Sequence, residues 1–131
     1  MTTHDFKITT TFPTARIADL LVCAREGGSG YWCAAWEHHF PETPTEPDPA
    51  VVEAVCGLDC YLAPFVGGWI SVREDDGTEH RLDAAGFQRA LAILSEKYPR
   101  HLHDALDDGR FDATTGDVFI QCAIFGDIVY G

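Results

Sequence analysis

The segment Glu26-Gly27-Gly28-Ser29-Gly30-Tyr31-Trp32 constrains the fold of this chain more than any other. It follows an apolar stripe at helical spacing, Ile17, Leu20, Leu21 and Ala24, for which Thr14 is the expected cap. Gly27 is expected to end this helix in the left-handed conformation. Two large aromatic residues come directly after the glycines and need a packing partner. The pattern therefore predicts a helix end and a tight turn into a strand from Tyr31 to Phe40.

The same segment has a second interpretation, as the wall of a ligand pocket. Glu26 and Ser29 would supply polar contacts, and Tyr31 or Trp32 would stack on a planar group such as a nucleobase. A phosphate loop is excluded, because these glycines leave the negative end of a helix and no lysine follows them. The candidate ligand-binding residues are Arg25, Glu26, Gly27, Gly28, Ser29, Gly30, Tyr31, Trp32 and Gln121.

The middle of the chain contains one clear hairpin and one ambiguous stretch. Apolar and polar residues alternate over 69–74 and 78–82, and Asp75-Asp76-Gly77 joins the two runs. This pattern predicts an antiparallel hairpin. Prolines spaced through residues 41–49 predict a polar surface loop. Residues 50–65 are ambiguous: 51–55 fit the start of a short helix and 60–65 fit a strand, and the pattern does not decide the assignment. A further strand is predicted over 6–12, ended by Pro13.

Two helical regions are predicted in the C-terminal half. Asp83 is the expected cap of the first, which Pro99 breaks before a shorter helix over 101–108. Thr114 and Asp117 have the spacing of a capping box at the start of the last helix. Residues 118–125 are apolar on every side except at Gln121, so this helix is expected at the centre of the core. Gln121 is expected either to orient the glycine segment or to face water.

These elements predict a single α+β domain spanning residues 1–131. A small antiparallel sheet containing the hairpin is expected, with three to four helices packed mainly on one face and the C-terminal helix central. A length of 131 residues with 46% hydrophobic composition is sufficient for one buried core.

The charge balance limits the partners. Twenty-one acidic against nine basic residues give a formal charge of -12, which disfavours direct binding to nucleic acid or to an anionic membrane. An acidic surface is instead compatible with a basic protein partner. The apolar run at 118–125 is too short to span a bilayer. Five cysteines without framework spacing, and no recognisable leader, predict reduced thiols and a cytoplasmic location.

Neither a metal nor a cofactor is expected. None of the candidate ligands has the paired short spacing of zinc sites. These candidates are Cys56 with Cys60, His38 with His39, and His101 with His103. No Gly-x-Ser-x-Gly elbow surrounds Ser29, so no catalytic residue is assigned. The other paired carboxylates are explained by turns and helix caps.

Three stretches together resemble a group of small uncharacterised proteins encoded by bacteriophages and prophages. They are the glycine segment, Lys97-Tyr98-Pro99-Arg100-His101, and the closing stretch from Thr115-Gly-Asp-Val-Phe-Ile-Gln to Phe125-Gly-Asp-Ile-Val-Tyr-Gly131. The resemblance covers most of the chain outside the loop at 41–49. It implies a genomic setting, in the cytosol of a host bacterium, and not a mechanism.

In that setting the first hypothesis is a small non-catalytic binding protein that counteracts a host defence system. It would either block a host protein or sequester a nucleotide-derived signal. Blocking predicts an acidic patch, with Glu74, Asp75, Asp76 and Glu79 as protein contacts and further acids from 42 to 53. Sequestering predicts a cationic pocket, with Arg25, Arg73 or Arg81 as anion contacts.

Two alternatives come from other classes of protein. One is an enzyme acting on a nucleotide-derived signal, with Glu26 or Asp117 as its acid or base. The other is a homo-oligomeric virion or assembly component, which predicts an apolar surface over residues 60–69.

Overall fold

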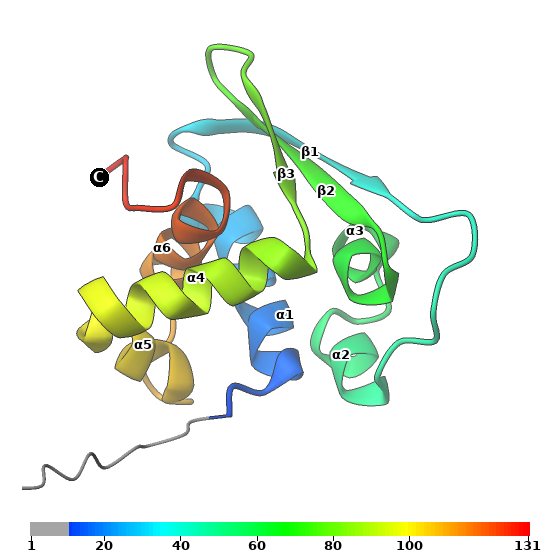
Figure 1. Cartoon of the computed structure of the whole chain (residues 1–131), viewed down its shortest axis with the longest axis horizontal. Helices are drawn as coiled ribbons and strands as arrows, with labels where there is room; N and C mark the ends of the chain where they lie inside the picture. The colour runs from blue at the N-terminus through cyan, green and yellow to red at the C-terminus, as the bar shows by residue number, and fades with distance from the viewer. Residues whose placement is uncertain (1–10) are drawn as a thin grey trace, which may run out of the picture.

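The computed structural model of the chain describes residues 11–131 and has a mixed α+β fold, as expected (Figure 1). A three-stranded antiparallel sheet has the order β1 (Cys33–His39), β2 (Trp69–Glu74) and β3 (Glu79–Leu82). Six α-helices accompany it in this part of the chain, more than the three to four expected: α1 (Thr14–Cys23), α2 (Pro49–Ala54), α3 (Asp59–Leu62), α4 (Ala84–Lys97), α5 (Pro99–Leu106) and α6 (Ala113–Phe125).

The predicted hairpin is confirmed as β2 and β3. Gly77 has φ 93°, and the Glu74 N–H donates to the Thr78 carbonyl, so the turn closes where Asp-Gly was expected. Side chains then alternate across the sheet. Ile70, Val72 and Leu82 are fully buried beneath it, whereas the residues between them on the strands face outward.

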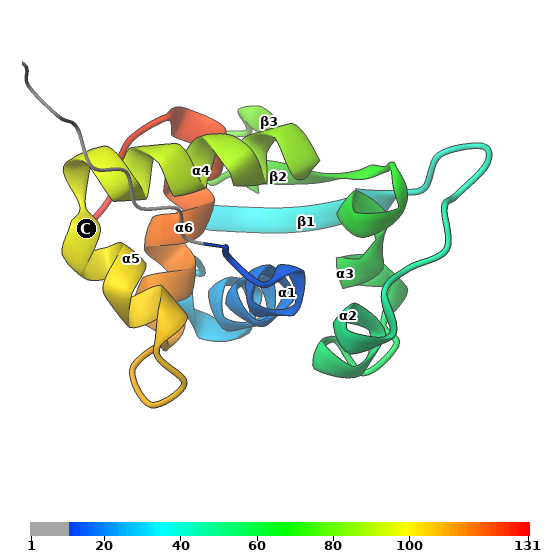
Figure 2. The ribbon, with the colours of Figure 1, turned by 60° about the horizontal axis from the view of Figure 1, so that its bottom comes forward.

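The C-terminal helix α6 lies at the centre of the core, as predicted. It contacts α1, α4, α5 and β3 (Figure 2). Every residue from Thr115 to Ala123 is buried. The capping box predicted from Thr114 and Asp117 is wrong. Asp112 is the cap and exchanges hydrogen bonds with Thr115, so the helix begins earlier and Asp117 falls inside the protein.

The end of the first helix also differs from the prediction. Gly27 does not adopt a positive φ, and the chain continues as a π-helical turn, η1 (Ala24–Gly28), closed by a 2.8 Å bond from the Ser29 N–H to the Ala24 carbonyl. At the helix start Pro13 occupies the cap position and Thr14 is the first helical residue.

Two of the glycines in this region permit close contact between helices. A Cβ atom on Gly28 would lie 2.1 Å from the Ala113 carbonyl oxygen, and one on Gly116 would lie 2.6 Å from that of Leu20. Only a hydrogen in place of a side chain lets α1 and η1 approach α6 this closely.

The ambiguous stretch over 50–65 forms helical segments, and the strand considered for 60–65 does not form. After α2 and α3 the chain forms a 3₁₀ turn, η2 (Ala63–Val66), and most of this apolar run is buried. Of the apolar side chains over 60–69, those of Cys60, Phe65 and Trp69 are half-buried and the others are buried. Of the loop predicted over 41–49, residues 41–48 form neither helix nor strand, whereas Pro49 begins α2 and Asp48 caps it by accepting from the Ala50 N–H.

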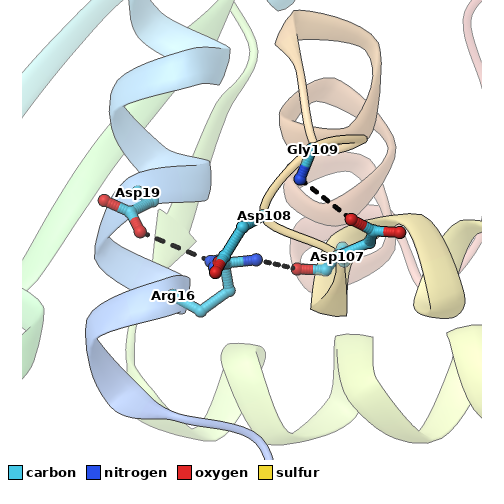
Figure 3. Close-up of polar contacts among 6 residues, drawn as sticks. Arg16, Asp19, Asp107, Asp108 and Gly109 are labelled. Carbon is cyan, nitrogen blue, oxygen red and sulfur yellow. Dashed lines mark hydrogen bonds and ion pairs between the residues drawn. The ribbon is translucent and has the colours of Figure 1, made fainter.

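Arg16 ties α1 to the segment after α5 (Figure 3). Its guanidinium donates to the Ala105 carbonyl at 2.9 Å, pairs with Asp108 and lies 4.2 Å from the ring centre of Phe111. Its Nε lies 3.4 Å from Asp19. These contacts link the end of α5 and the segment after it to the first turn of α1.

The remaining predictions concern the strand after the glycine segment, the helices around Pro99 and a strand near the N-terminus. The strand predicted at 31–40 is the shorter β1, and the helices expected on either side of Pro99 are α4 and α5. The strand predicted at 6–12 falls almost entirely outside the described residues. No helix in the described part of the chain has the length and apolar character needed to cross a membrane.

Candidate functional site

A buried carboxylate holds the glycine segment against the central helix. Asp117 is 6% exposed and accepts hydrogen bonds from four side chains. The donors are Ser29 Oγ at 2.8 Å, Tyr31 Oη at 2.6 Å, Trp32 Nε1 at 2.7 Å and Gln121 Nε2 at 3.0 Å. Hydrogen bonds to a charged acceptor are about twice as strong as neutral ones, so this cluster fixes the path of the chain after η1.

Gln121 extends the cluster to the C-terminal segment, residues 127–131. Its Oε1 accepts from the backbone N–H groups of Val129 and Tyr130, both at 2.8 Å. Its Nε2 donates to Asp117 and, more weakly, to the Tyr130 carbonyl at 3.3 Å. The alternative in which Gln121 orients the glycine segment is thus the one found, because its amide is completely buried and acts through Asp117.

The C-terminal segment in turn covers Trp32. The Tyr130 ring stacks on Trp32 with centroids 5.3 Å apart, and its hydroxyl donates to Glu74. His80 Nε2 lies 2.7 Å from the same carboxylate. The contacts with His80 and then Tyr130 lower the pKa of Glu74, while the bond to Glu74, with some burial, raises the pKa of Tyr130 to about 12.

These contacts change the role expected of two candidate residues. Trp32 is 2% exposed, and neighbouring rings cover it, so it has no face on which a ligand could stack. Glu74 is buried and bonded within the fold rather than presented at the surface. Asp75, Asp76 and Glu79, the other predicted protein contacts, are exposed at the hairpin tip.

A cavity of about 210 Å³ lies on the other side of the glycine segment, between η1 and the start of β1. Its lining includes Arg25, Ser29 and Gly30 from the predicted set, together with Trp36 and the first residues of β1. Gly28, Trp32 and Gln121 belong instead to the packed interior. The structure therefore divides the predicted site into a buried cluster and an open cavity.

Arg25 is the charged residue of this cavity. Its guanidinium carbon lies 5.9 Å from the ring centre of Trp36 and 5.6 Å from that of Tyr61. The Tyr61 hydroxyl donates to Glu26 at 2.9 Å. Burial, and then this bond, raise the pKa of Tyr61. Sequence reasoning missed Trp36 and Tyr61 because only the tertiary fold brings β1 and α3 beside η1.

Most of the exposed acidic residues within 11–131 fall into two separate areas. One is the hairpin tip, and the other is the acidic end, formed by the end of β1, the loop at 41–48, α2 and the start of α3 (Figure 1). The acidic end carries Glu37, Glu42, Glu46, Asp48, Glu53 and Asp59, all exposed. No lysine or arginine occurs between Glu26 and Val72.

Metal ligands and thiols give no site in the described residues. No group of three or more His, Cys, Asp or Glu side chains within 11–131 is arranged to hold a metal ion. All five cysteines are free thiols, and burial raises the pKa of Cys122 to about 11.

Comparison of the chain with protein-family models, with curated proteins and with solved structures gave no match in any of the three.

Proposed function

We propose that this protein is a non-catalytic binding protein that uses its acidic end to cover a basic surface of another protein. In the phage setting that the resemblance suggests, the partner is a host defence protein. The observation that carries the proposal is the segregation of charge. Residues 27–71 contain acidic residues but no lysine or arginine.

Within the described residues, no lysine or arginine pairs with the carboxylates of the acidic end. None of the six forms an ion pair within residues 11–131, whereas Arg16, Arg81, Lys97 and Arg110 each pair with an acid elsewhere. Gathering like charges in one region costs repulsion that the fold does not offset. A basic partner would supply the missing cations and speed association by electrostatic attraction.

The acidic end is also held in shape. The Thr45 N–H donates to the Val66 carbonyl at 3.1 Å, and Asp48 caps α2. Prolines in the loop restrict its backbone further. A binding surface that is ordered before contact loses less entropy on association.

Binding rather than catalysis is supported by the buried acids. Asp117 and Glu74 each already accept hydrogen bonds from several groups of the protein. Using either as an acid or base would break contacts that hold the C-terminal segment and the glycine segment. Their arrangement fits a structural role.

The proposal is tested by affinity capture from a lysate of the bacterial host. The wild-type chain is compared with the triple variant Glu42→Gln, Glu46→Gln, Glu53→Gln. The matched control is Asp75→Asn, Glu79→Gln, Glu96→Gln, which removes the same charge from exposed side chains outside the acidic end.

We expect the wild type and the control to retain one basic protein, with affinity falling as salt is raised. Three exposed ion pairs at about 0.5 kcal/mol each predict about tenfold weaker binding for the acidic-end variant. Equal binding by the two variants, or capture of no basic protein, would contradict the proposal.

A further inference from the structure

We infer that the cavity between η1 and β1 is a second binding site, for the phosphate or carboxylate group of a small molecule held by Arg25. The cavity is lined by η1, the turn after it and the first residues of β1 up to Trp36, whereas the acidic end begins at Glu37. The site is independent of the proposed protein partner.

The first step of the argument is the unused donors of Arg25. Its side chain is exposed, and its guanidinium makes neither an ion pair nor a hydrogen bond to any residue from 11 to 131. The rings of Trp36 and Tyr61 lie within 6 Å of it, at cation–π distance. These contacts hold the cation in place without occupying its N–H groups, which can form two parallel bonds to an oxyanion.

The second step concerns the neighbouring acid. Glu26 follows Arg25 directly and would be the obvious intramolecular partner. Tyr61 instead donates to its Oε1 at 2.9 Å, so that the carboxylate is engaged beside α3. The same tyrosine thus lies beside the cation and binds the competing anion.

The third step is a backbone donor in the same cavity. Gly30 lines it, and its N–H has no acceptor among the residues that the structure describes. A Cβ atom placed on Gly30 would meet nothing within 4 Å, so this part of the turn is open to an incoming group. The position of the turn itself is fixed, because the Ser29 hydroxyl donates to Asp117. Short π-helical segments such as η1 occur often at functional sites.

The size of the cavity sets the class of ligand. At about 210 Å³ it is smaller than the roughly 300 to 1,000 Å³ typical of pockets for drug-sized molecules. It fits one anionic group with a small attached portion and leaves the rest of a larger ligand outside. Trp36 is half-buried at the rim and offers an apolar surface to that remaining portion.

The site is tested by titrating the isotopically labelled full chain and following its backbone and indole N–H signals by NMR. The probes are inorganic phosphate, AMP and adenosine, so that anion and ring are varied separately. We expect saturable shifts at Ser29, Gly30 and Trp36 with phosphate and with AMP, and none with adenosine at the same concentration.

Variants then assign the anion contact. Arg25→Gln is expected to weaken AMP binding about tenfold or more, since hydrogen bonds to a charged group are lost. The control Arg100→Gln removes the same charge from an exposed residue of α5, which does not line the cavity, and should leave binding unchanged. Glu26→Gln should tighten binding about threefold by removing a nearby negative charge.

Three results would overturn the inference: no saturable shift with phosphate or AMP, equal weakening by Arg25→Gln and Arg100→Gln, or adenosine binding as tightly as AMP. A preserved spectrum for each variant shows that the fold is intact. None of these outcomes depends on whether a protein partner binds the acidic end.

Discussion

Replacing Asp117 by Asn is expected to destabilise the protein by about 2 to 4 kcal/mol. Each oxygen of Asp117 accepts from two donors. An amide has only one acceptor oxygen, and its NH₂ group must face one of these pairs. The hydroxyls of Ser29 and Tyr31 can rotate to accept from it, but the N–H groups of Trp32 and Gln121 cannot.

At least one buried N–H therefore loses its acceptor in Asp117→Asn, which costs about 1 to 3 kcal/mol. The other bonds also weaken from charge-assisted to neutral. Removing a buried charge relieves some desolvation, but the four donors around the carboxylate outweigh this gain. The change in free energy of unfolding is measured by urea denaturation monitored by tryptophan fluorescence.

The matched control for this prediction is Asp112→Asn in the same helix. It removes an equal charge at the exposed cap of α6, where asparagine caps as well as aspartate, so stability should change by less than about 0.5 kcal/mol. If Asp117→Asn costs no more than Asp112→Asn, the hydrogen bonds to Asp117 do not hold the fold as described.

Three further outcomes are expected. Gly116→Ala should cost about 1 to 3 kcal/mol in urea unfolding, because its Cβ would lie 2.6 Å from a carbonyl of α1, whereas Gly27→Ala has open space and should not destabilise. A tyrosine hydroxyl, a backbone N–H and a lysine lower the pKa of Asp127 to about 2 from 3.8. Its contribution to stability is present above about pH 4 and lost as pH falls through about 2, so acid titration of Asp127→Asn should show a flatter slope. With a thiol reagent, the native chain should react first at exposed Cys56 and not at buried Cys122; the reverse order would contradict the burial described.

Local patterns predicted the hairpin and the central helix well. Asp-Gly with alternating neighbours defines the turn before β3, and a run that follows a helix cap and is apolar on every side indicates a buried helix. Both signals depend on residues close in the sequence. The mixed fold and the main helical layer followed from them.

The importance of the glycine segment could be predicted from the sequence. Which of its residues are buried and which line the cavity could not. Position 28 requires glycine because the start of α6 lies against it, and this contact joins residues far apart in the chain. The local pattern instead suggested a left-handed stop at Gly27. Only the tertiary fold separates the buried Trp32 from the cavity beside Arg25.

The capping role predicted for Asp117 was wrong because two possible cap spacings overlap. Thr114 with Asp117 and Asp112 with Thr115 both have the required separation, and the helix begins at the earlier one. A usable signal was present, since Asp117 and Gln121 are four residues apart and share one face of an apolar helix. Two polar residues on a buried face must find partners, which here are the glycine segment and the C-terminal segment.

The most direct test of the proposed function is zero-length carboxyl-to-amine cross-linking of the chain with its captured partner, followed by mass spectrometry of the linked peptides. We predict links from Glu42, Glu46 and Glu53 to lysines of the partner. Links that arise only from Asp75, Asp76 or Glu79 at the hairpin tip, or links equally spread over all exposed acids, would contradict binding through the acidic end.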